Sequence, residues 1–356
     1  MQPSIEAFVA CLENAPTIPE YRAADGVGDL RAEWNRCLSN GPGIFIIRGA
    51  FADLGVVHAM TDLFRSIISS EQGGAGSDHF AAAGASTRIW NVLQKTAVLD
   101  PRVHVGYYAN PFVAMAAESW LGPGYQMTAQ VNVVHPGGAA QYPHRDYHLG
   151  FQTDDVARLF PPQAHALSVS LTLQGMIAHT DMSVESGPTM VLPYSQRYPL
   201  GYLAWRDPAF AEVFAQRYVQ LPLDAGDAVF FNPALHHAAG TNHTNADRIG
   251  NLLQVSSPFG KPMEAVDTYG ITAAVYEALL ELKDPELVRC AVAASADGYS
   301  FPTNIDTDPP SAGLAPETAQ ALTLRAVADR WPVGRFRAEL SAHQRRRQPT
   351  PTFATD

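Results

Sequence analysis

The sequence predicts a mostly β protein, a sandwich or barrel flanked by helices, folded as one domain over residues 1–356. Between about residues 125 and 260, short β-branched and aromatic runs alternate with turn residues, which is typical of such folds. Only 17% of the residues are charged, and 27 glycines and 27 prolines suit a loop-rich β fold better than a helical bundle. Apolar residues at helical spacing on both sides of this region indicate the flanking helices.

The N-terminal part, residues 1–124, is predicted to be mainly helical. Apolar spacing and turn residues predict helices over 3–14, 29–38, 52–68 and 110–121. The uninterrupted apolar run at 44–47 predicts a short buried strand. Residues 69–87 are rich in Gly, Ala and Ser, and we predict a long loop that is either disordered or covers an active site.

The central part, about 125–260, carries the predicted strands. They are the short β-branched runs at 130–134, 167–173, 189–192, 218–221, 228–231 and 250–255. Pro193 and Pro222 adjoin two of these runs, which places them at strand ends or edges.

The C-terminal part is predicted to be a helical extension over 261–340 followed by a polar tail over 341–356. Helical spacing returns over 273–292, with a break near Asp284-Pro285. Residues 296–315 form a predicted loop, and 316–331 a helix with Pro316 in its first turn. The basic run Arg345–Arg347 is expected to lie in the solvated tail.

The net charge and the hydropathy of the sequence indicate which kinds of partner are disfavoured. The net charge of −11 and pI near 5.5 disfavour nucleic acid and anionic lipid. No signal-peptide pattern and no apolar run of the ~18 residues needed to cross a bilayer is present. Cys11, Cys37 and Cys290 are far apart and odd in number, so we expect free thiols in a cytoplasmic protein.

The segment that carries chemistry runs from Gln141 to His148 and contains His144 and Asp146. Residues two apart in a strand share a face, so this imidazole and carboxylate would lie side by side, with Arg145 pointing away. Such a pair can supply two ligands to a divalent metal. A surface turn capped by the aspartate explains the triplet alone equally well, so a third ligand elsewhere has to decide.

The third ligand is expected from the pair His236 and His237, of which the second lies 93 residues after His144. Only one of the two can face a metal, because neighbours in a strand point to opposite sides. Two histidines and one carboxylate leave three positions open on an octahedral metal, as in non-haem Fe(II) oxygenases. Arg248, 11 residues beyond His237, offers a planar fork for the far carboxylate of 2-oxoglutarate, whose other end chelates iron.

Together these residues resemble the phytanoyl-CoA dioxygenase family. The resemblance rests on the H-x-D triplet and on the distal H-x-x-G-x-N, followed by a hydroxyl residue and an arginine: His144, Asp146, His237, Gly240, Asn242, Thr244 and Arg248. Residues 43–49, 185–196 and 226–231 agree as well, and the family spacing selects His237 over His236. The turn after Pro193 departs from the pattern, with Tyr194 and Gln196 where Gly and His are usual.

The resemblance covers residues 40–260 and implies a double-stranded β-helix, a jelly-roll or cupin-like core with iron near one open end. It implies Fe(II) held by His144, Asp146 and His237, with O2 and 2-oxoglutarate as co-substrates. The residues expected at 2-oxoglutarate are Arg248, Thr244, Gln130 and Asn132. Halogenating relatives lack the carboxylate, so Asp146 favours hydroxylation, although desaturation, ring formation and epimerisation begin in the same way.

The substrate pocket is expected to include His148, Phe151 and Arg158, because they follow the metal-binding triplet directly. The substrate is expected to be a small organic molecule, and no basic, adenine-sized signature points to a coenzyme A thioester. Two alternatives remain open: a non-catalytic cupin-like protein that binds metal or ligand, and a cupin-type hydrolase or isomerase that uses Zn(II) or Mn(II) as a Lewis acid.

Overall fold

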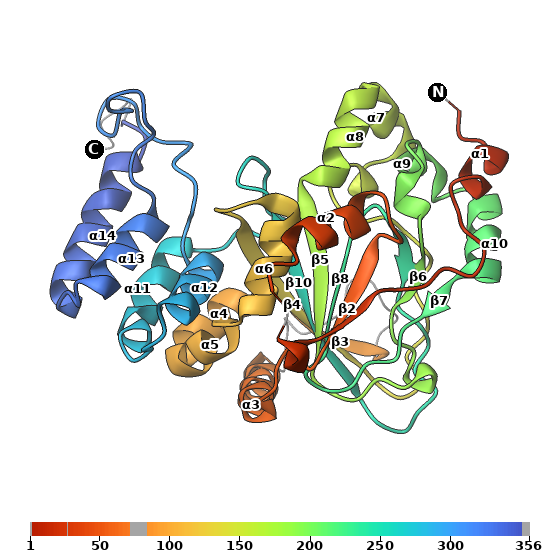
Figure 1. Ribbon diagram of the computed structural model, residues 1–356, viewed down its shortest axis with the longest axis horizontal. Helices are drawn as coiled ribbons and strands as arrows, with labels where there is room; N and C mark the ends of the chain where they lie inside the picture. Colours follow the sequence, from red (N-terminus) through yellow and green to blue (C-terminus); the bar gives the residue numbers. More distant parts are fainter. Residues whose placement is uncertain (1, 27, 72–83, 351–356) are drawn as a thin grey trace.

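Two β-sheets form the centre of the protein in the computed structural model, which describes residues 2–26, 28–71 and 84–350 (Figure 1). The larger sheet has, in spatial order, β1 (Glu20–Arg22), β2 (Ile44–Arg48), β8 (Ala228–Phe231), β5 (Thr172–Ala178), β10 (Arg248–Ser256), β4 (Gln126–Val134) and β3 (Ser86–Ile89). The smaller sheet has β7 (Val219–Gln220), β6 (Met190–Leu192) and β9 (His236–Ala238). Every pairing is antiparallel except that of β1 with β2. This is the jelly-roll core that the sequence predicts.

Strands β2 and β8 are buried on both faces, which explains their uninterrupted apolar sequences. Phe45 and Ile47 belong to the core beneath the helices, where Phe45 stacks on Trp34 with ring centroids 4.7 Å apart. Ile44 and Ile46 belong to a second core, between the two sheets. The period-two alternation of the strand divides its four apolar residues between these cores.

Helices from both the N-terminal and the C-terminal parts of the chain cover the outer face of the larger sheet, and some of them lie beyond its edge (Figure 1). They are α2 (Arg31–Ser39), α3 (Leu54–Glu71), α4 (Val92–Leu99), α5 (Pro101–Tyr108), α6 (Pro111–Leu121), α11 (Thr268–Leu279) and α12 (Pro285–Ser295). Farther out lie α13 (Ala319–Ala328) and α14 (Val333–Arg347), with their own apolar cluster. At the other side of the molecule α1 (Ile5–Val9) packs on α10 (Pro208–Arg217).

Four of these helices begin in the same way, with an Asp or Asn followed by proline. The side chain of Asn110, for example, accepts hydrogen bonds from the backbone N–H groups of Phe112 and Val113. Proline suits the next position because its fixed φ is helical and its missing N–H needs no partner there. The predicted break near Asp284-Pro285 is such a start, and it separates α11 from α12 as expected.

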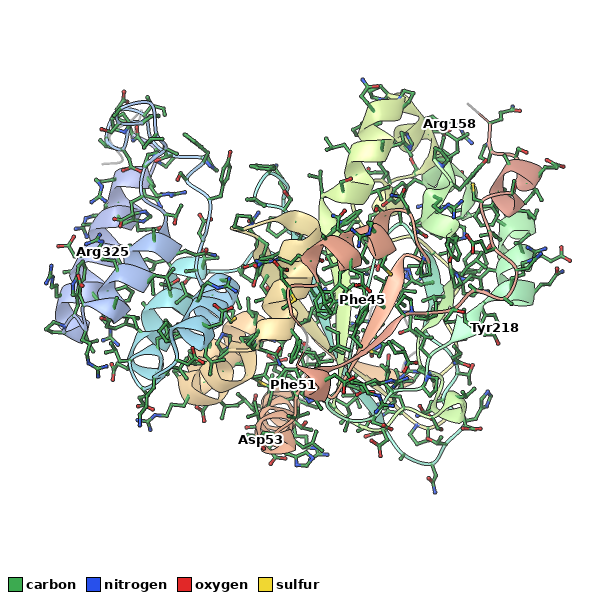
Figure 2. All side chains as sticks on the ribbon, viewed as in Figure 1. Phe45, Phe51, Asp53, Arg158, Tyr218 and Arg325 are labelled. Carbon is green, nitrogen blue, oxygen red and sulfur yellow. The ribbon has the colours of Figure 1, made fainter. Side chains whose placement is uncertain are left out.

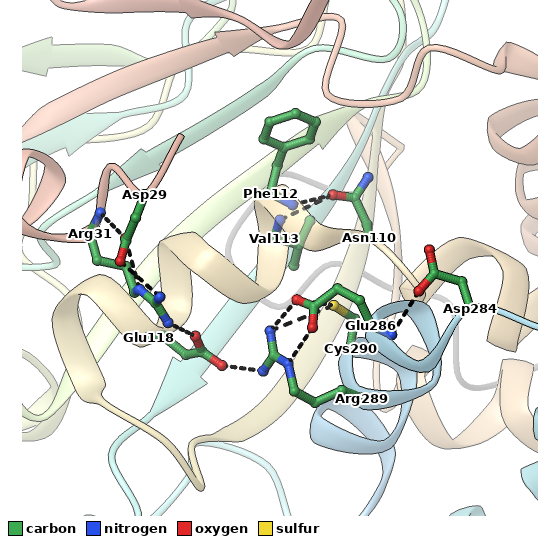
Figure 3. A network of polar contacts seen from close by, with 10 residues as sticks. All are labelled: Asp29, Arg31, Asn110, Phe112, Val113, Glu118, Asp284, Glu286, Arg289 and Cys290. Atoms are coloured by element: carbon green, nitrogen blue, oxygen red, sulfur yellow. Dashed lines mark hydrogen bonds and ion pairs between the residues drawn. The ribbon is translucent and has the colours of Figure 1, made fainter. Parts of the chain in front are cut away.

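An ion-pair network joins the N-terminal helices to the C-terminal extension (Figure 3). The nearly buried carboxylate of Glu118, on α6, lies 2.8 Å from Nη1 of Arg31 on α2. It also pairs with Arg289 on α12, whose Nη2 lies 2.7 Å from Glu286. Because Glu118 pairs with both Arg31 and Arg289, the network links α12 to helices α2 and α6, which precede the jelly roll in the chain.

Several predicted elements differ from the structure. The fold is less purely β than expected, since fourteen α-helices surround the ten strands among the residues described. The strand over 167–173 is wrong, because α8 (Pro162–Ser170) fills most of it and β5 begins at Thr172. Proline in the first turn of α8 precedes that apolar run and favours a helix, whereas a short apolar run by itself is compatible with a helix or a strand. The first helix is also shorter than the predicted 3–14.

At the C-terminus, α13 begins at Ala319 under a Thr318 cap, so Pro316 precedes the helix. The basic run Arg345–Arg347 is not a solvated tail: it ends α14, and Arg347 donates hydrogen bonds to the carbonyls of Tyr299 and Pro302. Most of the predicted loop over 69–87 lies outside the described residues, but Ser86–Ile89 is a strand. The three cysteines are free thiols, and within the described ranges no helix has both the length and the hydropathy to span a membrane.

Two buried histidines make the stability of the fold sensitive to acid. Burial lowers the pKa of His104 and His179 to about 3, from 6.5. The folded protein keeps both neutral, so their contribution is complete above pH 6.5 and is lost as the pH falls toward 3. At pH 5.5 each lowers the free energy of unfolding by about 1.4 kcal/mol, because the unfolded chain is then mostly protonated.

We therefore expect urea unfolding of His179→Gln to show a smaller loss of stability between pH 7.5 and 5.5 than the wild type, by about 1.4 kcal/mol. His243→Gln, at an exposed position in the loop before β10, is the control and should keep the wild-type difference. An equal pH dependence in His179→Gln and the wild type would contradict the assignment.

Candidate metal centre

A cavity of about 570 Å³ lies on the inner face of the larger sheet. The register of the strands brings alternate residues of β4, β5 and β10 to this face, since paired residues on neighbouring strands point to the same side. The residues that these three strands contribute are Gln130, Asn132, Gln174, Gly175, Met176, Arg248, Gly250, Leu252 and Gln254. Burying polar groups without hydrogen-bond partners costs folding free energy, so a polar sheet face inside the protein indicates a ligand-binding site.

His144, Asp146 and His237 meet at the wall of this cavity. Nε2 of His144 lies 3.5 Å from one carboxylate oxygen of Asp146, and Nε2 of His237 lies 3.4 Å from the other. One donor atom from each residue falls within 4.8 Å of the other two. The three side chains predicted as metal ligands are thus brought together.

The backbone holds the two histidines opposite each other. His144 and His237 form an isolated antiparallel bridge with N···O distances of 2.9 and 3.1 Å. The predicted strand through His144 and Asp146 is wrong, because the segment forms a bridge at His144 alone. Asp146 is positioned instead by its N–H, which donates to the carbonyl of Pro233 at 3.3 Å.

Both imidazoles present the same nitrogen to the centre. Nδ1 of His144 donates to the carbonyl of Tyr142 at 2.8 Å, and Nδ1 of His237 donates to that of Leu235 at 2.9 Å. A carbonyl can only accept, so both Nδ1 atoms carry a proton, and Nε2 is the nitrogen that can offer its lone pair when the ring is neutral. Metal-binding histidines are typically oriented by such a bond from their other ring nitrogen.

The charge of the cluster suits a divalent cation. Burial alone would raise the pKa of Asp146, but His144, His237 and the Gln174 hydrogen bond together hold it well below its usual value. Burial lowers the pKa of His144. At neutral pH the cluster therefore offers a carboxylate and a neutral imidazole at His144, the protonation states that bind metal.

The doublet His236-His237 divides as strand alternation requires. His237 faces the cavity, whereas His236 points into the opposite core, with its ring centroid 5.2 Å from that of Phe8. Burial lowers the pKa of His236 well below its usual value, and its Nε2 has no hydrogen-bond partner in the described part of the chain. The position of His236 excludes it from the cluster.

Arg248 is the first residue of β10 and reaches the same cavity. Its side chain is buried, and one guanidinium nitrogen donates to the carbonyl of Ser186 at 3.0 Å. Burial lowers its pKa to about 10, and no carboxylate among the residues described lies within ion-pair distance of it. A buried guanidinium of this kind is suited to an anionic ligand.

A family model described as phytanoyl-CoA dioxygenase (PhyH) matches residues 40–250, more than half of the chain. The protein belongs to the phytanoyl-CoA dioxygenase family. No curated protein matches the sequence.

Three solved structures illustrate the similarity of this phytanoyl-CoA dioxygenase family member to known folds. The non-haem α-ketoglutarate-dependent carbocyclase SnoK of nogalamycin biosynthesis is 18% identical, with TM-score 0.48 over 69% of this chain and 88% of that chain. The epimerase SnoN of the same biosynthesis is 19% identical, with TM-score 0.44 over 64% and 81%. HygX from Streptomyces hygroscopicus, with nickel and 2-oxoglutarate bound, is 15% identical, with TM-score 0.45 over 64% and 87%.

The family implies Fe(II) as metal and 2-oxoglutarate with O2 as co-substrates, and the residues fit them. Two imidazole nitrogens and a carboxylate form the donor set that Fe(II) takes in such oxygenases. Arg248 supplies a buried cation for a carboxylate in the same cavity. Gln130 and Asn132, the residues predicted to contact 2-oxoglutarate, line the cavity, and Oδ1 of Asn132 is buried without a hydrogen-bond partner among the described residues.

Three predicted site residues are not brought to the cavity. The hydroxyl of Thr244 donates to Oδ1 of Asn242 at 2.7 Å, which holds it within its own turn and away from a ligand. His148 begins the short 3-10 helix η2 (His148–Phe151), and its Nδ1 lies 3.3 Å from the hydroxyl oxygen of Ser168 on α8. Arg158 is half exposed on α7 (Asp154–Leu159), at the edge of the molecule (Figure 2). Phe151, in contrast, lines the cavity as predicted.

Several other residues of the cavity are not among those predicted from the sequence: Arg88, Tyr142, Gln174, Trp205, Arg206, Gln254 and Met263. Tyr142 lies two residues before His144, so alternation along the metal-binding segment could have indicated it. Met263 comes from the loop after the jelly roll, beyond the family match. No local signal in the sequence points to it or to Trp205, because tertiary packing alone brings them to the site.

Arg145, between the two ligands of the H-x-D triplet, is fully buried away from the metal cluster. It donates to the carbonyls of Ser195, in the 3-10 helix η4 (Ser195–Arg197), and of Tyr198. Its guanidinium occupies the space beside Gly201, at the start of α9 (Gly201–Ala204), where an added Cβ would lie 1.7 Å from Cζ of Arg145. Gly201 is therefore required for Arg145 to fit.

Gly201→Ala is expected to lower the free energy of unfolding by about 1–3 kcal/mol, because the new methyl group displaces the buried guanidinium. Chemical denaturation measures the change. Gly106→Ala, in α5, is the matched control: nothing lies within 4 Å of its new Cβ, and alanine favours a helix. Equal stability of the two variants would show that Arg145 can move without cost.

Proposed function

We propose that the protein is an Fe(II)- and 2-oxoglutarate-dependent oxygenase that hydroxylates a small organic molecule. The observation that carries the proposal is the orientation of His144 and His237, whose Nδ1 atoms are bound to carbonyls so that both Nε2 atoms face Asp146. Arg248 in the same cavity supports 2-oxoglutarate as the co-substrate. With Fe(II) and 2-oxoglutarate bound, such a site uses O2 to convert a substrate C–H bond to an alcohol, and 2-oxoglutarate leaves as succinate and CO2.

We propose that one side of the cavity binds the metal and 2-oxoglutarate and that the other side binds the substrate. His144, Asp146 and His237 would hold the metal, while Arg248 would bind the far carboxylate of 2-oxoglutarate through its planar fork. The sheet residues Gln130 and Asn132 add polar contacts on that side. The presence of Asp146 as a ligand favours hydroxylation over halogenation.

The other side of the cavity is aromatic and is proposed to receive the substrate. The ring of Trp205 lies 6.5 Å from that of His144 and 6.5 Å from that of Tyr142. Phe151 and Tyr142 are each about half exposed, so they form a mouth open to solvent. Aromatic walls beside the metal ligands favour a substrate that presents an apolar C–H-bearing surface to the metal.

Succinate formation tests the proposal. Protein purified without O2, loaded with Fe(II) and mixed with 2-oxoglutarate and then O2, is expected to form succinate slowly even without its substrate. The anaerobic Fe(II)–2-oxoglutarate complex is expected to show a visible charge-transfer band. A protein that gives neither signal is not an oxygenase, and O2-independent turnover with Zn(II) or Mn(II) would identify a hydrolase or isomerase instead.

A further inference from the structure

Two glutamines on the inner face of the larger sheet are linked to the metal-binding segment. Gln174 on β5 and Gln254 on β10 are cross-strand partners, so their side chains lie next to each other on the face that lines the cavity. Both residues are buried. Neither is part of the metal cluster itself.

Gln174 holds the side chain of Asp146. Its Nε2 donates to a carboxylate oxygen of Asp146 at 2.5 Å, and this oxygen is the one nearer to His237. The other amide atom of Gln174, Oε1, is buried and has no hydrogen-bond partner among the described residues. The amide must therefore point its nitrogen at the carboxylate, because a carboxylate oxygen facing Oε1 would be repelled.

Gln254 holds the residue that follows Asp146. The hydroxyl of Tyr147 donates to Oε1 of Gln254, and the tyrosine side chain is fully buried. The backbone of Tyr147 has φ 67° and ψ 151°, a region used almost only by glycine. A non-glycine residue keeps such a conformation only where its surroundings enforce it, and strain of this kind is concentrated at functional sites.

Resting on the proposed function, we infer that Gln174 and Gln254 are positioning residues for the ligand Asp146. One glutamine fixes the plane of the carboxylate, and the other fixes the backbone turn that directs this side chain toward His144 and His237. Because the two glutamines are neighbours in the sheet, β5 and β10 hold the aspartate in place before any metal binds. A hydrogen-bonded ligand carboxylate of this kind strengthens metal binding.

Titration with Co(II) tests the inference, since this ion takes nitrogen and oxygen ligands and has visible absorption bands that report its coordination. Gln174→Met keeps the length of the side chain and removes the donor. We expect its Co(II) dissociation constant to rise by about 10- to 100-fold and its absorption bands to change at saturation.

Gln254→Met and Tyr147→Phe each remove one partner of the second contact. Each is expected to raise the Co(II) dissociation constant by about 2- to 10-fold, and the double variant by no more than either alone. Gln196→Met is the matched control, because Gln196 is also buried but donates to the backbone of Gly41 away from the cavity. It should bind Co(II) as the wild type does.

Wild-type affinity and an unchanged spectrum in a folded Gln174→Met protein would overturn the inference and leave the proposed function standing. If Gln174→Met does not fold, Gln254→Met and Tyr147→Phe decide by the same two measurements. If the wild type itself fails to bind Co(II), the proposed function and the inference fall together.

Discussion

His237→Ala is expected to abolish tight metal binding and to lower succinate formation by at least about a hundredfold. Removing a hydrogen-bond partner of a metal ligand already costs 10- to 100-fold in affinity or activity, so losing the ligand itself costs at least as much. Without His237 the cluster retains one imidazole and one carboxylate. Anaerobic titration with Fe(II) and a succinate assay measure the two effects.

His236→Ala is the matched control, since it removes an imidazole from the adjacent position of the same strand. This side chain lies against Phe8 in the opposite core, so its loss leaves a cavity and costs stability. Metal binding and succinate formation should remain at the wild-type level once the variant is folded. Loss of metal by His236→Ala and retention by His237→Ala would reverse the assignment and contradict the orientation of β9.

The sequence could predict the metal cluster because each of its ligands is marked by a short-range pattern. His144 and Asp146 stand two apart, and His237 is selected from its doublet by the spacing to Gly240 and Asn242. The strand predicted for the first pair is absent, but one bridge at His144 and the backbone hydrogen bond from Asp146 to Pro233 still place both side chains together. The pattern therefore identified the residues although the local structure behind it was partly wrong.

Residues that reach the site through sheet register could not be predicted in this way. Gln174 touches Asp146 only because tertiary packing brings β5 to the segment that follows β4, and no residue near either position in the sequence encodes that contact. The strand predicted over 167–173 also stops short of Gln174, because its apolar residues at 167–170 belong to the helix α8. Thr244 shows the opposite error, because its spacing fits the family while its hydroxyl is bound within its own turn.

Arg248→Ala is expected to raise the dissociation constant of 2-oxoglutarate by at least about thirtyfold, with Fe(II) binding little changed. Truncating one partner of a buried charge pair costs about 2–5 kcal/mol, and 2 kcal/mol corresponds to a factor of about 30. Arg248 is buried at the cavity wall with only the Ser186 carbonyl as a hydrogen-bond acceptor among the described residues, so its charge is available to a carboxylate ligand.

Titration of the anaerobic Fe(II) protein with 2-oxoglutarate, followed by the visible charge-transfer band, measures this constant. Arg248→Lys should fall between the wild type and Arg248→Ala, because lysine keeps the charge but loses the planar fork. Arg197→Ala is the control: Arg197 is partly exposed, 3.5 Å from Glu13, and it lies outside the cavity. An Arg248→Ala protein that binds 2-oxoglutarate as tightly as the wild type would place the far carboxylate elsewhere, and Arg88, the other buried arginine on the sheet side of the cavity, would then be the residue to test.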